Sequence, residues 1–168
     1  MAIGENHIRR DIFNNKIVNK GKLSKGLDPY MEESYQDYNQ NDYAPTLMHN
    51  QALKFLDRNK DEKFFLYYAS PLPHLPLQAP KKWVDYYRKK LGEEKPYIGD
   101  SGYYPNQFPK ATYAGMISYL DEQVGEIISK LKEIGKYENT VIVFTSDNGP
   151  THVGQVDIDF FNSAGIFA

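Results

Sequence analysis

The sequence contains no cysteine among its 168 residues. This absence excludes a disulfide framework, a thiolate metal site and a cysteine nucleophile within these residues, although it does not indicate a redox compartment. The sequence also lacks an apolar run that approaches the roughly 20 residues needed to cross a bilayer. Its first residues contain no apolar core of the kind that a signal peptide has.

The charges show no large excess of either sign. Against 22 Asp and Glu residues the sequence has 20 Lys and Arg residues, which gives a formal net charge of -2 at pH 7. The basic residues are scattered among acidic ones, and this disfavours nucleic acid and anionic membranes as partners. The length and the 40% apolar content predict one domain over residues 1–168, with a variable polar segment at 1–45 and a core segment at 46–168.

Three segments have the pattern of helices. Apolar residues recur at helical spacing after Pro45 and Thr46, and a short helix is expected around "KKWVDYYRKK". The clearest pattern predicts a long helix near residues 110–134, with Gly135 as its C-terminal stop. Its apolar residues fall on one arc of the helix: Tyr113, Met116, Ile117, Leu120, Val124, Ile127, Ile128, Leu131 and Ile134.

Two other apolar stretches, near residues 64–69 and 140–146, have no polar alternation and are typical of strands covered on both faces. Strand, long helix and strand form a βαβ unit, so we expect an α/β fold in which these two strands run parallel. Polar residues that follow the two strands should then meet at the carboxyl edge of the sheet, where open α/β sheets bind ligands.

The residues expected at that edge are His74, Asp147 and Asn148. Asp147 and Asn148 offer oxygen donors that suit calcium or magnesium, but two oxygens are too few for either ion, and "SDNG" taken alone is more typical of an ordinary turn. His74 lies in a proline-rich loop and could hydrogen bond to an anionic oxygen, or could simply be exposed. His152 follows closely and is a candidate for a supporting position beside the cation ligands, with a surface loop histidine as the alternative.

Three quoted segments carry a resemblance to a known family: "FFLYYASPLPHLPLQAP", "YAGMISYLDEQVGEIISKLKEIGKYENTVIVFTSDNGP" and "DFFNSAGIFA". Together they resemble the sulfatase family of the alkaline-phosphatase-like superfamily, from about Tyr43 onward. The resemblance implies part of a large α/β sandwich and the hydrolysis of sulfate monoesters. It also implies that Asp147 and Asn148 are ligands of a divalent cation, usually calcium, and that the catalytic residue His74 contacts the sulfate group.

The family's nucleophile, a formylglycine made from Cys or Ser in a Cys/Ser-x-Pro-x-Arg motif, has no counterpart in this sequence. The sequence therefore resembles an internal fragment of a sulfatase, and the chain alone is expected to be inactive. The implied substrate of the parent enzyme is a sulfated small molecule or sulfated carbohydrate. The family is typically exported.

Two alternatives stay open at this point. One is a phosphatase, phosphodiesterase or phosphotransferase of the same superfamily, because a metal-bound aspartate and a histidine also suit phosphate. The other is a non-catalytic remnant that keeps part of the cation site.

Overall fold

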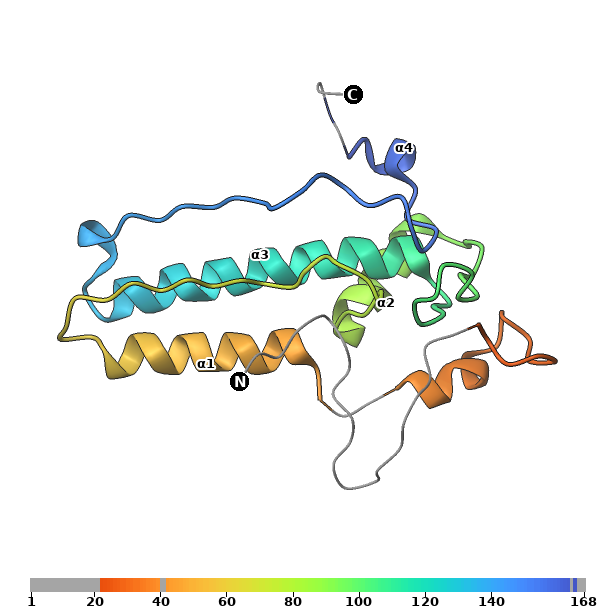
Figure 1. Cartoon of the computed structure of the whole chain (residues 1–168), viewed down its shortest axis with the longest axis horizontal. Helices are drawn as coiled ribbons and strands as arrows, with labels where there is room; N and C mark the ends of the chain where they lie inside the picture. Colours follow the sequence, from red (N-terminus) through yellow and green to blue (C-terminus); the bar gives the residue numbers. More distant parts are fainter. Residues whose placement is uncertain (1–21, 40–41, 164, 166–168) are drawn as a thin grey trace.

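The computed structural model describes residues 22–39, 42–163 and 165. In the described residues the chain forms helices joined by extended segments and loops (Figure 1). The elements in chain order are the 3-10 helix η1 (Glu32–Tyr38), α1 (Ala44–Arg58), α2 (Lys81–Leu91), α3 (Pro109–Glu133), the 3-10 helix η2 (Tyr137–Asn139) and α4 (Ile158–Phe161).

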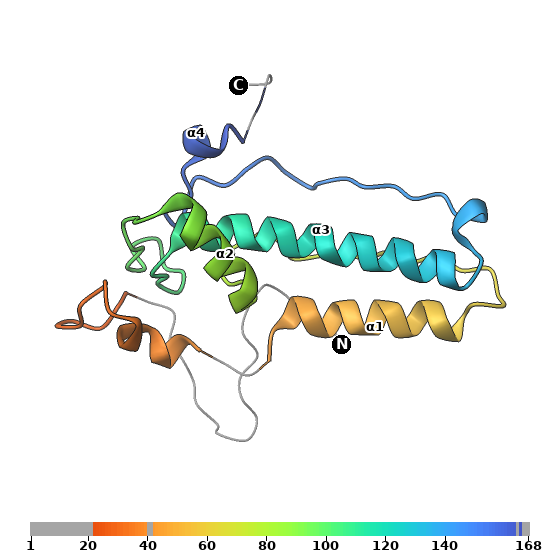
Figure 2. The same ribbon diagram turned by 180° about the vertical axis from the view of Figure 1, so that it is seen from behind.

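The long helix α3 is the central element, and both α1 and α2 pack against it (Figures 1 and 2). Its first residue, Pro109, suits a position where the backbone N–H would have no helical partner. Its end is followed by Gly135, whose φ of +67° is the left-handed conformation typical of a residue just past a helix. The predicted long helix is thus confirmed, as are the helices predicted after Pro45 and around residues 81–90.

A chain of polar contacts joins α1 to α3. The hydroxyl groups of Thr46 and Tyr119 lie 2.7 Å apart, and Nε2 of the buried His49 lies 2.7 Å from Oε2 of Glu126. Between these pairs, the buried Gln123 donates to the carbonyl of Pro45 at 3.1 Å. Because buried polar groups are costly unless hydrogen bonded, these contacts fix how α1 lies along α3.

Helix α2 packs on a different face of α3. A β-carbon added to Gly115 would lie 3.2 Å from Cβ of Trp83, so only a very small residue fits at this crossing. The indole N–H of Trp83 donates to Oε2 of Glu122 at 2.8 Å, and the hydroxyl groups of Tyr87 and Ser118 lie 2.7 Å apart. These contacts determine which face of α2 points inward.

The main apolar cluster lies at the N-terminal half of α3. Its α3 residues meet residues of the proline-rich loop and of the chain that precedes α4. The buried members are Leu72, Leu75, Leu77, Tyr113, Met116, Tyr119 and Val156. The predicted apolar arc of α3 is only partly buried, because the side chain of Ile117 is 42% exposed.

The predicted α/β fold with two parallel strands is wrong for the described residues, where no sheet forms. Residues 64–69 and 140–146 are extended, but neither takes part in a ladder of backbone hydrogen bonds within the described part of the chain. Both segments run along α3 in the same direction (Figures 1 and 2). A strand needs a neighbouring strand to satisfy its backbone groups, and the described residues supply none to either segment.

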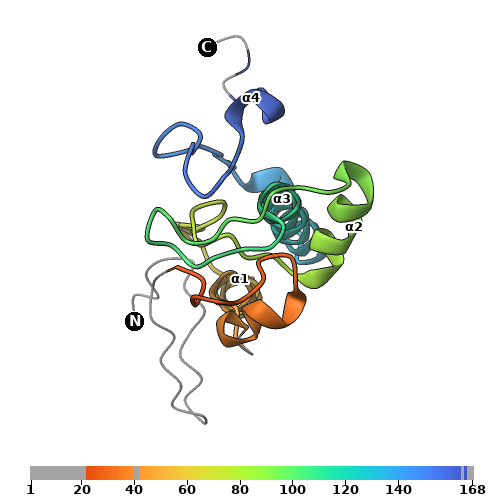
Figure 3. The same cartoon turned by 90° about the vertical axis from the view of Figure 1, so that its right-hand side faces the viewer.

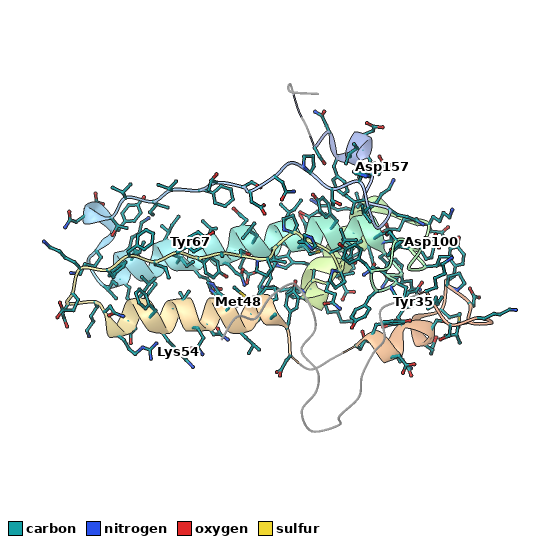
Figure 4. All side chains as sticks on the ribbon, viewed as in Figure 1. Tyr35, Met48, Lys54, Tyr67, Asp100 and Asp157 are labelled. Carbon is teal, nitrogen blue, oxygen red and sulfur yellow. The ribbon has the colours of Figure 1, made fainter. Side chains whose placement is uncertain are left out.

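The expectation that both faces of these segments are covered is also wrong. Along residues 64–69 the side chains alternate: Tyr68 is half-buried and donates to Oε1 of Gln123 at 3.1 Å, whereas Tyr67 is 80% exposed. Figure 4 shows Tyr67 on the extended segment that runs along α3. In the second segment residues 141–146 are all exposed, with Val143 80% and Phe144 74% accessible. Helices therefore cover one face of the first segment only.

Most of the predicted polar segment 1–45 lies outside the described residues, which begin at residue 22. Of this segment, residues 22–39 contain η1, residues 42–43 precede α1, and residues 44–45 are the first two residues of α1. Among the helices of the described residues, none combines the length and the apolar character that a bilayer span requires.

Candidate functional site

The loops that follow the two extended segments pack against each other. The proline-rich loop contributes Leu75 and Leu77, and the chain between Asn148 and α4 contributes Gly154, with a φ of +75°. A β-carbon on Gly154 would lie 2.5 Å from Cδ2 of Leu75 and 3.6 Å from Cδ1 of Leu77. The loops that carry His74 and Asp147 thus belong to one packed region of the molecule.

His74 is exposed on the proline-rich loop and its ring has a defined orientation. Its Nδ1 lies 2.6 Å from the carbonyl oxygen of Leu75. Because a carbonyl oxygen only accepts, this contact places a proton on Nδ1. The ring of Tyr103 meets the imidazole edge to face, with 6.0 Å between the ring centroids. A histidine held in this way on a stiff loop is suited to contact a ligand reproducibly.

Asp147 and Asn148 lie at a bend after the second extended segment, and both are exposed. The hydroxyl of Ser146 donates to the carbonyl of Asn148 at 2.8 Å and closes this bend. The side-chain amide nitrogen of Asn148 donates to the backbone carbonyl of Gly149 at 2.8 Å. Since the nitrogen is engaged in this way, the amide oxygen is the end of the side chain that could bind a cation.

The described residues supply only part of a metal site. No group of three or more His, Cys, Asp or Glu side chains is placed to hold an ion in the described ranges. Asp147 and Asn148 offer hard oxygen donors, which fits calcium or magnesium in chemical type, although calcium takes about six to eight such ligands. The donor set therefore fits a divalent cation that receives its other ligands from elsewhere.

His152 follows Asn148 by four residues in the sequence and is exposed. Its neighbour Thr151 accepts a hydrogen bond at Oγ1 from the backbone N–H of Val153 at 3.2 Å, which turns the chain toward Gly154. The supporting position predicted for His152 beside the cation ligands stays a prediction.

Sequence reasoning missed Tyr103 as a neighbour of His74, and it gave no sign of the contact between Gly154 and Leu75. Tyr103 lies in the connection between α2 and α3, about 30 residues from His74 in the chain. Only its place among several aromatic residues of that connection could have drawn attention to it. A contact between residues so far apart leaves no periodic signal in one sequence.

A separate pocket of about 640 Å³ lies at the N-terminus of α3. There the carboxylate of Glu94 accepts the backbone N–H groups of Lys110 and Ala111, at 2.6 and 3.1 Å. Burial raises the pKa of Glu94, and these hydrogen bonds partly oppose that effect. Nζ of Lys110 lies 3.1 Å from Asp157, which Figure 4 labels beside α4. These charged groups cap and anchor helices, so this pocket is not the candidate site.

Comparison with known proteins identifies the class. The sulfatase family model matches residues 6–163, so the chain belongs to the sulfatase family. The match begins well before residue 43, where the resemblance in the sequence was first apparent.

Among individual relatives, the chain is 31% identical to arylsulfatase J of Mus musculus over 127 residues, which cover 74% of this chain and 19% of that protein. It is 30% identical to an arylsulfatase of Clostridium perfringens over 133 residues, which cover 67% and 27%. An N-acetylgalactosamine-6-sulfatase of Homo sapiens is 29% identical over 100 residues, which cover 59% and 15%.

A solved structure is also similar. The crystal structure of Ps i-CgsB in complex with k-i-k-neocarrahexaose matches with a TM-score of 0.55 and 30% identity, covering 71% of this chain and 24% of that one. The chain thus spans between 15% and 28% of the length of the relatives that it matches. The sulfatase family is a family of hydrolases, and it generally suggests a divalent cation.

Proposed function

We propose that this chain is part of the catalytic domain of a sulfatase, which cleaves the S–O bond of a sulfate ester with water and releases an alcohol and sulfate. The proposal rests chiefly on one observation. The loops that carry His74 and Asp147, 73 residues apart in a chain that belongs to the sulfatase family, pack together through Gly154 and Leu75.

In this proposal Asp147 and Asn148 are two oxygen ligands of a divalent cation, and the cation is calcium. A carboxylate and an amide oxygen are ligands that calcium prefers, and the exposed bend leaves room for oxygens from other sources. Such a cation would supply positive charge that polarises a sulfate group. His152, a few residues along the same loop, is the proposed supporting residue.

His74 is the proposed catalytic residue that contacts the sulfate oxygens. The contact between Nδ1 and the Leu75 carbonyl fixes the orientation of the imidazole, and a histidine side chain is a suitable hydrogen-bond donor to an anionic oxygen. A positively charged imidazole donates a charge-assisted hydrogen bond to an anionic oxygen. The nucleophile of the reaction is not assigned to any residue of this sequence.

The names of the relatives indicate only a broad class of substrate. One relative is named for a sulfated amino sugar, and one matched structure holds a carrageenan oligosaccharide. We therefore propose a sulfated carbohydrate as the substrate of the complete enzyme, with a sulfated small molecule as the other candidate.

A calcium titration followed by NMR tests the cation site. With only two protein ligands, the dissociation constant is expected to be about millimolar, and the amide signals of Asp147, Asn148 and Gly149 should move together. Asp147→Asn should abolish these shifts. Asp159→Asn removes an exposed carboxylate from α4 and is the matched control, which should leave the shifts intact. Shifts that persist in Asp147→Asn would contradict the proposal.

A further inference from the structure

Helix α2 concentrates positive charge in a chain that is acidic overall. Its eleven residues, "KKWVDYYRKKL", contain five basic residues and one acidic residue, whereas the whole chain has 20 basic and 22 acidic residues. Basic residues in the last turn of a helix interact favourably with the helix dipole, so part of this charge has a structural reason. That reason does not apply to Lys81 and Lys82, which lie in the first turn.

The inward and outward faces of α2 are fixed by its contacts with α3. Trp83 and Tyr87 point inward, because they hydrogen bond to Glu122 and Ser118. The exposed Arg88 is engaged by the ring of Phe108, whose centre lies 3.6 Å away. The other exposed residues of α2 are Lys81, Lys82, Tyr86, Lys89 and Lys90, with the half-buried Asp85 beside Lys81. We call these six residues the α2 outer face. Its formal charge is +3, from four lysines and one aspartate.

Two of these lysines are already engaged. Lys81 pairs with Asp85 at 2.6 Å, and Lys82 pairs with Glu122 at 2.6 Å. Lys89 and Lys90 are exposed, and Nζ of Lys90 lies 4.5 Å from the centre of the Tyr86 ring. The charge that is available to a ligand is therefore concentrated in the C-terminal half of the helix.

Tyr86 gives this part of the face a second chemical character. Its side chain is 44% exposed, and its ring is held between Trp83 and Tyr87, with centroids 6.0 and 5.0 Å away and nearly perpendicular planes. An aromatic ring that is fixed in this way offers an apolar surface with little loss of conformational freedom on binding. Exposed lysine ammonium groups beside it offer positive charge.

We propose that the α2 outer face binds an anionic polysaccharide, with Lys89 and Lys90 contacting its sulfate groups and Tyr86 stacking on a sugar ring. Clusters of basic residues are typical of surfaces that bind sulfated polymers, and the aromatic ring favours a polysaccharide over a purely electrostatic partner. That the polymer is sulfated rests on the proposed function. The surface adds a binding site for polymer that lies beyond the residues of the candidate site.

The position of α2 suits this role. The proline-rich loop leads directly into α2, so His74 lies only seven residues before Lys81. In Figure 3, which looks along α3, α2 lies on one side of α3 and residues 140–150 lie on another. A polymer could therefore contact the α2 outer face while one of its sulfate groups is near the proline-rich loop.

Heparin, a sulfated polysaccharide, and chemically desulfated heparin are the probes for the test. The double variant Lys89→Gln/Lys90→Gln of the full chain should bind heparin about tenfold more weakly than the wild type, as expected for two lost exposed ion pairs. Tyr86→Ala should also weaken heparin binding, with little change in its salt dependence. The matched control Lys60→Gln/Lys63→Gln removes two exposed lysines that follow the C-terminal end of α1, and it should bind heparin as tightly as the wild type does.

Equal loss in the two double variants would overturn the proposal, because it would mean that heparin responds only to net charge. Unchanged heparin binding in Lys89→Gln/Lys90→Gln would also overturn it. So would duplex DNA that binds the wild type as tightly as heparin does and whose affinity does not change in Tyr86→Ala. The calcium titration at Asp147 in the same variants separates the two proposals. Loss of heparin binding with intact calcium shifts supports the α2 outer face, and absent calcium shifts count against the proposed function alone.

Discussion

A β-carbon on Gly154 would lie only 2.5 Å from Cδ2 of Leu75, so the two loops of the candidate site meet at a position where no side chain fits. Gly154 also has a φ of +75°, a conformation that residues with a side chain rarely adopt. Both features make Gly154 the point where the loop after Asn148 is held against the loop that contains His74.

Replacing Gly154 by alanine should destabilise the protein by about 2–3 kcal/mol, because the substitution adds both backbone strain and a steric clash. Gly135→Ala is the matched control: its φ is +67° and nothing lies within 4 Å of an added β-carbon. The control should cost only about 1 kcal/mol, from backbone strain alone. Urea unfolding of both variants measures the difference, and equal costs would mean that the contact with Leu75 is loose.

Substitutions on adjacent residues of α3 test where the core lies. Met116 is fully buried in the main cluster, so Met116→Ala should lower the free energy of unfolding by about 3 kcal/mol. Ile117→Ala, at a side chain that is 42% exposed, should cost less than about 1 kcal/mol. Chemical denaturation gives both values. A larger cost at Ile117 would show that the apolar arc expected from the sequence faces the core after all.

The pairing of Glu122 with α2 should make stability depend on pH. Burial tends to raise the pKa of Glu122, but hydrogen bonds from Lys82 and Trp83 outweigh it and lower the pKa below its ordinary value of 4.5. A carboxylate with a lowered pKa stabilises the folded state fully above its unfolded pKa, and this stabilisation is lost as pH falls through the folded pKa.

Glu122→Gln should therefore lower the free energy of unfolding by about 1 kcal/mol at pH 7. The difference from wild type should shrink as the pH falls below about 4.5. Glu138→Gln, at an exposed position in η2, is the control and should track the wild type at every pH. A constant deficit of Glu122→Gln from pH 7 to pH 3 would contradict this account of the ion pair.

The exposed apolar run near residues 141–144 should make the chain bind apolar dyes. Val143→Lys should reduce the fluorescence of a bound dye such as ANS and increase solubility, because it places a charge in the middle of that run. The free energy of unfolding should change by less than about 0.5 kcal/mol, since Val143 is 80% exposed. Gln51→Lys adds the same charge at an exposed site on α1 and should leave dye binding unchanged.

The helices were predictable from the sequence because a helix satisfies its own backbone groups. Hydrogen bonds within one segment, apolar residues at helical spacing, a proline at the start and Gly135 at the end are all local signals. They place α1, α2 and α3 nearly correctly. Their packing on α3 depends on long-range pairs such as Trp83 with Glu122, and the sequence pattern does not contain these pairs.

The same reasoning failed for residues 64–69 and 140–146 because a strand depends on a second segment. Apolar composition indicates that a segment prefers to be extended and covered, and it does not reveal whether its neighbours are present. The roles of His74, Asp147, Asn148 and His152 stay predictions. What the described structure adds to them is the packing of their two loops, which depends on the contact between Gly154 and Leu75.

The most direct test of the central claim is whether calcium and sulfate bind to one site. NMR titration of the full chain with inorganic sulfate, with and without calcium, measures the affinity at the His74 imidazole. The account predicts that calcium strengthens sulfate binding, that Asp147→Asn removes this effect, and that His74→Gln weakens sulfate binding while His152→Gln does so less. Sulfate binding at His74 that is indifferent to calcium and to Asp147→Asn would contradict a shared sulfatase site.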